Sequence, residues 1–248
     1  ILPPPRKFFV YNLEQIRNYP QYPVTPIHQK ALSQCVAILD YSQRNCEEYP
    51  TQFKQKIYFF PMPFTFINEK EQMVPYMTEQ SGPIGVLFFG SMNTRRHNIM
   101  EHLKKSSGGR YNIVAGASFF GEELCEMVKR SKIILNLHFR PKNSLLETCR
   151  IHDCLTFGNA HIISEEPASD ENETRERYAN VVEYIPVIKN DLSNIKVLEN
   201  KINSLIGKTW TDSERVQREN EIRKIEDFTN NQSNILQCYR YPHLFHKY

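Results

Sequence analysis

The chain has 248 residues, roughly one and a half domains of typical size, and 40% of them are hydrophobic. This composition is enough for a sizeable core. Its 31 basic and 28 acidic side chains leave a net charge of +3, which excludes the strongly basic balance of a nucleic-acid-binding protein. The longest purely aliphatic or aromatic runs, such as Ile57–Phe60 and Val86–Phe89, are far shorter than the roughly 20 residues of a membrane helix. We therefore expect no transmembrane segment.

The chain opens at Ile1 without a basic segment followed by an apolar run, so we expect no secretory signal. We expect a cytoplasmic protein, which could be one domain of a longer polypeptide. Cysteines occur at positions 35, 46, 125, 149, 154 and 238, and none of them forms a CxxC pair. In a chain with a full core, this spacing indicates small buried residues in a reducing compartment rather than a disulfide framework.

The first 65 residues alternate between short apolar runs and amphipathic segments. Strands are expected over residues 7–13, 35–39 and 56–60, and helices over 27–34 and 45–55. This order is typical of parallel βαβ units. Residues 66–83 are polar and end in Ser81-Gly82-Pro83, which indicates a linker.

A second alternating series runs over residues 84–210. Strands are expected at 85–89, 111–115, 132–137, 160–164 and 181–187, and helices at 96–105, 122–130, 145–157 and 192–205. A charged helix over 212–228 and a polar, aromatic tail fill residues 211–248. The predicted fold class is α/β with two Rossmann-like lobes, of which the N-terminal lobe, residues 1–65, is reduced.

Ligands of open parallel sheets bind at the carboxyl ends of the strands, where turns lead into helices. The turn Gly90–Arg96 (GSMNTRR) is the most suggestive of these places. Gly90 allows a close backbone approach, Ser91 and Asn93 could bind phosphate oxygens, and Arg95 or Arg96 could supply positive charge. The turn contains neither GxGxxG nor GxxxxGK[ST]. A plain strand-to-helix turn with solvated arginines is the alternative.

A second candidate lies on the predicted helix 145–157. Glu147, Arg150 and Asp153 are spaced by three residues and should lie along one side of the helix, where they could bind ribose hydroxyls and a pyrophosphate. Two alternatives stay open. Ser144 and Glu147 fit a capping box with Ser144 as the N-cap, and the stripe could be an internal salt-bridge ladder.

His138 is the histidine in the most favoured position, at a strand end beside Arg140, although a structural role is equally open. The eight histidines lack metal-ligand spacing such as HExxH, and the sequence has no DxD motif, so no metal site is predicted. GxSxG is also missing, which argues against an α/β-hydrolase.

Five segments together resemble glycosyltransferases of the GT-B class, and within it the small glycosyltransferases of large DNA viruses and bacteria. In chain order they are YNLEQ (11–15), LDYSQRN (39–45), FGSMNTRR (89–96), LETCRI (146–151) and IISE (162–165). The segments lie within residues 9–166, about two thirds of the chain.

The resemblance implies a nucleotide-diphosphate-sugar donor, with UDP favoured as the commonest in the class, held by the second lobe without a metal ion or other cofactor. A glycan or other hydroxyl acceptor would meet it at the cleft. It also implies roles for individual residues. The diphosphate would contact Gly90, Ser91 and Arg96, with support from Arg150, and the ribose would bind Glu147 or Asp153.

The E-x7-E pair of many retaining members is absent, because Leu145 stands eight residues before Asp153. Inversion is therefore slightly favoured, and it requires a base that takes the acceptor's proton. Asp40 and Glu14 each follow a predicted strand of the first lobe. Asp40 is the preferred candidate, because Glu14 can be interpreted as a helix-start acid.

Two other function classes are compatible with parts of the sequence. A Rossmann-type methyltransferase would use an acid at the position of Asp40, but it also wants a glycine-rich first loop, and residues 12–15 contain no glycine. A non-catalytic sugar- or protein-binding lobe of a larger polypeptide is the other alternative.

Overall fold

The computed structural model describes residues 8–16, 25–62, 84–117 and 119–239, with the backbone alone over 233–239. The chain divides into two compact units, Ile1–Pro63 with Glu226–Tyr248, and Phe64–Ile225. The predicted linker at 66–83 lies outside the described residues.

The first unit contains a parallel three-stranded sheet in the order β1-β2-β3. Its strands are β1 (Phe9–Asn12), β2 (Ala37–Asp40) and β3 (Ile57–Phe59), and its helices are α1 (Pro26–Gln34) and α2 (Gln43–Glu47). The prediction of a single helix over residues 45–55 is wrong. A 3₁₀ helix (Thr51–Lys56) follows α2 instead, because Pro50 ends one helical segment and begins the next.

The core of this unit lies between the sheet and its helices. Leu32 of α1 and Ile38 of β2 pack with Tyr49 and Phe53 in one buried cluster. The hydroxyl of Thr25 caps α1 by accepting a hydrogen bond from the backbone N–H of His28 at 3.1 Å.

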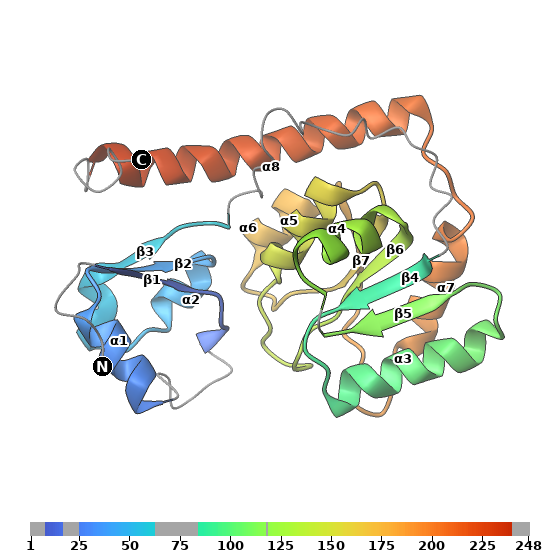
Figure 1. Ribbon diagram of the computed structural model, residues 1–248, viewed down its shortest axis with the longest axis horizontal. Helices are drawn as coiled ribbons and strands as arrows, with labels where there is room; N and C mark the ends of the chain where they lie inside the picture. Colours follow the sequence, from blue (N-terminus) through green and yellow to red (C-terminus); the bar gives the residue numbers. More distant parts are fainter. Residues whose placement is uncertain (1–7, 17–24, 63–83, 118, 240–248) are drawn as a thin grey trace. The chain divides into compact units, whose positions relative to one another are not determined.

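The second unit contains a parallel five-stranded sheet in the order β5-β4-β6-β7-β8 (Figure 1). The strands are β4 (Ile84–Phe89), β5 (Ile113–Gly116), β6 (Ser131–Asn136), β7 (His161–Glu165) and β8 (Val182–Ile185). The prediction of an α/β fold with parallel sheets is confirmed. Since the chain runs outward from β4 to β5 and then returns to β6 on the other side of β4, the direction of winding reverses between β4 and β6.

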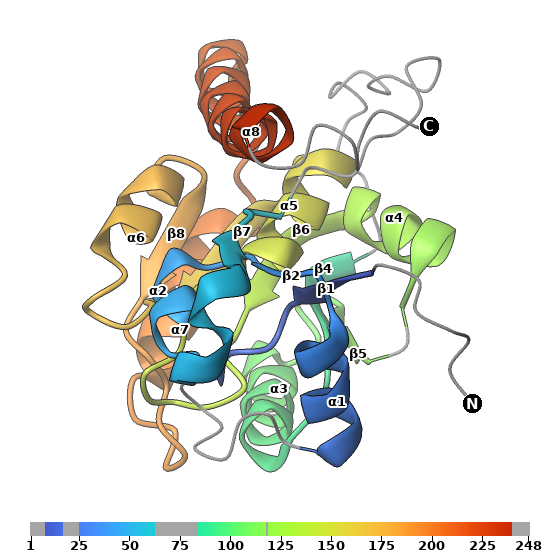
Figure 2. The same cartoon turned by 90° about the vertical axis from the view of Figure 1, so that its left-hand side faces the viewer.

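Helices cover both faces of this sheet, as right-handed crossovers require. The helices are α3 (Thr94–Ser107), α4 (Gly121–Lys129), α5 (Thr148–Phe157), α6 (Asn172–Tyr178) and α7 (Ile195–Leu205). Side chains of α3 and α7 form the core on one face, and those of α4, α5 and α6 form it on the other. Figure 2 shows α3 and α4 on opposite sides of β4 and β5. Helix α6 was not predicted.

Helix α8 (Asp212–Tyr239) has 28 residues and continues well past the predicted end at 228. At about 1.5 Å per residue it is about 42 Å long. Its residues up to Ile225 belong to the second unit, and those from Glu226 belong to the first. Ile222 and Ile225 join the core on the α4–α6 face, while the rings of Phe228 and Phe59 lie 6.4 Å apart in the first unit.

No helix among the described residues combines the length and apolar character needed to cross a membrane.

Candidate functional site

Two loops of the second unit flank the reversal of winding, and ligands of such sheets bind at this position. One loop follows β4 and the other follows β6. Asn93 connects them, because its side-chain amide donates a hydrogen bond to the carbonyl of Phe139 at 2.6 Å. The side-chain oxygen of Asn93 caps α3 by accepting from the backbone N–H of Arg96 at 2.9 Å. One side chain therefore fixes both the helix start and the neighbouring loop.

Arg96 is buried beneath this junction. Its guanidinium donates to the carbonyl of the exposed residue Ser91 at 2.7 Å, to the carbonyls of Leu137 and His138, and to Glu147 Oε1 at 3.0 Å. Burial lowers the pKa of Arg96 to about 10 and Glu147 opposes this shift, so the side chain is charged at neutral pH. Protein groups bind the guanidinium in this structure. Contact between Arg96 and a diphosphate stays a prediction.

Arg95 is buried as well. It forms an ion pair with Glu165 at the end of β7, and it donates to the carbonyls of Ile188 at 2.8 Å and His138 at 2.7 Å. Glu165 also accepts from the backbone N–H groups of His138 and Ile188, both at 2.7 Å. The alternative of a turn with solvated arginines is therefore wrong.

Glu147 and Ser144 do not form the predicted capping box. Helix α5 begins at Thr148, with Glu147 rather than Ser144 as its N-cap residue. The hydroxyl of Ser144 donates to the carbonyl of Arg140 at 2.8 Å. Glu147 binds two guanidinium groups, Arg96 at 3.0 Å and Arg150 at 2.6 Å, which attract a carboxylate more strongly than one backbone N–H does.

These partners set the charge of Glu147. Burial raises its pKa, but the positive charges of Arg150 and Arg96 outweigh that effect and hold the pKa below its ordinary value. The ion pair between Glu147 and Arg150 is the first step of the internal salt-bridge ladder that the sequence left open. Asp153 lies half-buried one turn further along α5. Leu145, from the absent E-x7-E pair, is buried just before this helix.

Gly90 makes room for Arg150. Its φ of +130° is a conformation that side chains disfavour, and a Cβ there would lie 2.7 Å from Nη2 of Arg150. Arg150 also donates to Asn136 Oδ1 at the end of β6. Among the three arginines of the site, Arg150 has the most exposed side chain, at 10%, against 4% for Arg95 and 2% for Arg96.

His138 is fully buried in the loop after β6. Its Nε2 must carry the proton, because it donates to the carbonyl of Glu166 at 2.9 Å and a carbonyl can only accept. Nδ1 is then an acceptor, and within the described part of the chain no group donates to it. Burial lowers the pKa of His138, so the ring is neutral at physiological pH.

The candidate base Asp40 lies at the end of β2 in the first unit, fully buried. Its Oδ2 accepts hydrogen bonds from Asn12 at 2.7 Å and from Asn45 and Tyr49 at 2.8 Å. Its Oδ1 accepts from the backbone N–H of Ser42 at 3.0 Å. Burial raises the pKa of Asp40 to about 6, although all four hydrogen bonds oppose the rise. The carboxylate connects β1, β2 and α2.

Glu14, the other candidate base, has an exposed side chain just beyond β1. Its backbone carbonyl accepts from the side-chain amides of Asn12 and Asn45, both at 2.8 Å. The same two amides bind Asp40, so both candidates belong to one local network. The catalytic role of either residue stays a prediction.

Among the residues that the structure describes, no group of three or more His, Cys, Asp and Glu side chains is placed to hold a metal ion. The five described cysteines are free thiols.

Sequence reasoning missed Glu165 as part of this site. Its signal was present, since Glu165 ends the IISE segment and follows a buried strand directly. An acid at that position can reach the turn after a neighbouring strand.

We predict that the stability difference between wild type and Asp40→Asn depends on pH. Because the pKa of Asp40 rises from 3.8 to about 6 on folding, the native state binds the extra proton between these values. This contribution stabilises the protein at low pH and is lost as pH rises through about 6. Asparagine lacks it and also places an amide among donors, at a cost of about 1–3 kcal/mol.

Urea unfolding of both proteins at pH 4.5 and pH 7.5 measures this difference, and the contributions of other titrating groups cancel. The variant should lose more stability at pH 4.5 than at pH 7.5. An equal loss at both values would show that Asp40 titrates normally in the folded protein.

Comparisons with known proteins add little at the level of sequence, because no family model and no curated protein matches the chain. Among solved structures, the chain is similar to Anabaena Alr3699/HepE in complex with UDP and glucose. The sequences are 6% identical, the TM-score is 0.47, and the match covers 92% of this chain and 72% of the Anabaena chain.

Proposed function

We propose that the chain is a glycosyltransferase that moves a sugar from a nucleotide-diphosphate sugar, with UDP favoured, to a glycan or other hydroxyl acceptor. One observation carries the proposal. Three features meet where the winding of a parallel sheet reverses. They are the turn at Gly90, the partly exposed Arg150, and Glu147, whose carboxylate binds two guanidinium groups. This combination suits a nucleotide, and the order of the five segments resembling GT-B enzymes supports sugar transfer.

Arg150 is the cation we assign to the diphosphate. It lies against Gly90, and the N-terminus of α3 follows Gly90 within the same turn. A helix N-terminus and an arginine both favour negative charge. During transfer the bond between the sugar carbon and the diphosphate oxygen breaks, and these groups would stabilise the charge that develops on the leaving oxygen.

Glu147 is the group we assign to the ribose. Each of its oxygens binds one arginine, and an ionised carboxylate has further lone pairs that can accept from hydroxyl groups. Asp153 on α5 is the alternative for this role.

The acceptor side belongs to the first unit in this proposal. An acceptor oxygen attacks the sugar carbon and its proton passes to Asp40 or Glu14, with inversion at that carbon.

The proposal is tested by thermal-shift measurements with UDP, GDP, TDP and CDP. A ligand at 100 times its Kd stabilises the folded protein by about 2.7 kcal/mol, so one of the four should raise the melting temperature clearly. Radiolabelled sugar transfer or slow donor hydrolysis should follow with the matching donor, and should survive EDTA. Binding of a glycan without any nucleotide would instead favour a non-catalytic sugar-binding lobe, and a strict need for Mg²⁺ would contradict the metal-independent form.

We predict that Gly90→Ala weakens binding of the preferred nucleoside diphosphate by about tenfold or more, because the new Cβ displaces the Arg150 guanidinium and a charge-assisted contact is worth about 1.5–3 kcal/mol. Gly108→Ala is a control for substitution at a glycine of positive φ outside the site. Gly108 also has a positive φ, +57°, but nothing lies within 4 Å of its Cβ position. Arg150→Ala, titrated beside both glycine variants, removes the guanidinium and leaves the backbone at Gly90 unchanged. A loss of affinity in Arg150→Ala similar to that in Gly90→Ala assigns the effect to Arg150, and a much smaller loss would assign it to strain in the turn.

We predict that one of Asp40→Asn and Glu14→Gln lowers kcat by about 10² or more with donor affinity near normal, because an amide cannot take the acceptor's proton. Melting temperatures of both variants identify any loss that comes from unfolding. Full turnover in both variants would leave a retaining mechanism as the better explanation.

A further inference from the structure

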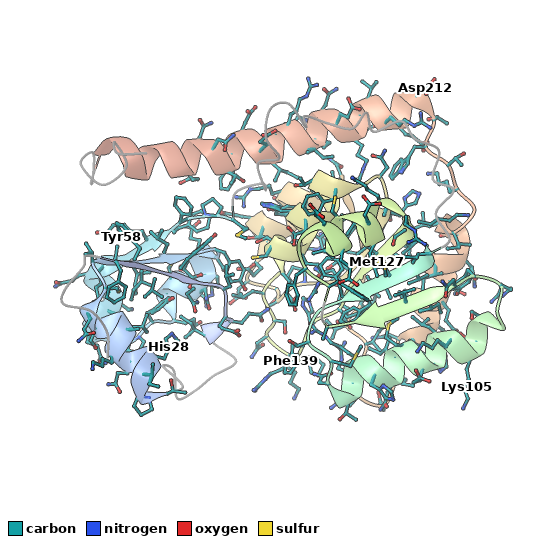
Figure 3. The ribbon with its side chains drawn as sticks, viewed as in Figure 1. His28, Tyr58, Lys105, Met127, Phe139 and Asp212 are labelled. Atoms are coloured by element: carbon teal, nitrogen blue, oxygen red, sulfur yellow. The ribbon has the colours of Figure 1, made fainter. Side chains whose placement is uncertain are left out.

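The loop after β6 presents an aromatic side chain to solvent beside the candidate site. Phe139, labelled in Figure 3, directly follows the fully buried His138. Its exposed fraction is 38%. Met92, in the loop after β4, is exposed to a similar extent. Both residues flank the reversal of winding, since Asn93 next to Met92 donates to the carbonyl of Phe139.

The ring of Phe139 is held in place from one side. The guanidinium carbon of Arg96 lies over it, 5.3 Å from the ring centroid, and also lies 5.2 Å from the centroid of the buried ring of Phe88. Arg96 itself is fixed by its hydrogen bonds to Ser91 and Glu147. Phe139 is therefore a rigid aromatic surface with a buried cation behind it and solvent beside it.

A series of pairwise contacts that begins with Arg96 connects this ring to Glu147 and then to Arg150. The guanidinium of Arg96 contacts the ring of Phe139 and also Glu147, and Glu147 contacts Arg150 at 2.6 Å, which lies against Gly90. A nucleoside diphosphate has the same sequence of chemical groups, a flat base, then a ribose with hydroxyls, then negative phosphates. Its ribose matches Glu147 and its phosphates match Arg150.

We propose that Phe139 is the stacking surface for the nucleobase of the donor. The inference rests on the proposed function and adds the residue that recognises the base end of the nucleotide. Aromatic rings stack on every base, so Phe139 provides affinity for a nucleotide, and the choice among bases comes from other groups.

The proposal is tested by calorimetric titration of wild type, Phe139→Leu and Phe139→Tyr with UDP, uridine and inorganic pyrophosphate. If the thermal-shift measurements select a different base, the matching nucleoside diphosphate and nucleoside replace UDP and uridine. Phe139→Leu should weaken the binding of UDP and of uridine by a similar factor, about tenfold or more, and leave the affinity for pyrophosphate unchanged. Phe139→Tyr keeps a flat ring and should bind like wild type. Phe120→Leu is the matched control, since Phe120 is 73% exposed in the loop after β5 of the same sheet.

The outcomes separate the two proposals. If wild type binds none of the four nucleoside diphosphates, the proposed function fails. If wild type binds one of them and Phe139→Leu binds it equally well, the stacking inference is overturned while the proposed function stands. The inference is equally overturned if Phe139→Tyr loses as much affinity as Phe139→Leu, or if Phe139→Leu raises only the KM of the acceptor, because the ring would then contact the acceptor.

Discussion

Two arginines that follow one another in the first turn of α3 reach carboxylates from different parts of the second unit. Arg95 binds Glu165 at the end of β7, and Arg96 binds Glu147 at the start of α5. Removing one partner of a buried ion pair typically costs about 3–5 kcal/mol, because the other charge is left buried and unpaired. The loops after β4, β6 and β7 are therefore fixed relative to one another by a single helical turn.

Buried ion pairs add little net stability compared with apolar side chains of similar size, because each charge must leave water. We infer that the role of these ion pairs is instead to fix the positions of neighbouring groups. They place the carbonyl of His138 between two guanidinium groups and orient Glu147 toward Arg150. They also neutralise the charges of Arg95 and Arg96 inside the protein, and Arg150 retains more access to solvent than either of them.

Apolar runs were sufficient to predict the strands of both sheets, because parallel strands carry apolar side chains on both faces. Burial is most complete in the central strands β4 and β6 and in β7. The same reasoning located the turn after β4 and the acids after β1 and β2. It failed where long-range charges decide local structure. Ser144 and Glu147 have the spacing of a capping box, but the spacing carries no information about Arg96, which is 51 residues away along the chain and binds Glu147. Burial of Arg95 and Arg96 was unpredictable for the same reason, since both bind carbonyl groups of the loop after β6, which are 41 to 43 residues away along the chain. Helix α6 was missed because its seven residues, NETRERY, have almost no apolar pattern.

The route of the chain through α8 has a consequence for folding during synthesis. The second unit is one continuous stretch, Phe64–Ile225, whereas the first unit combines Ile1–Pro63 with Glu226–Tyr248. Domains fold as the chain leaves the ribosome, N-terminal parts first. Here the three-stranded sheet is synthesised before the second unit, but the segment from Glu226 onward, which belongs to the same unit as that sheet, is synthesised only after the second unit. All residues of the second unit have been synthesised once Ile225 is added. This unit can therefore fold completely before the first unit has received the second half of α8.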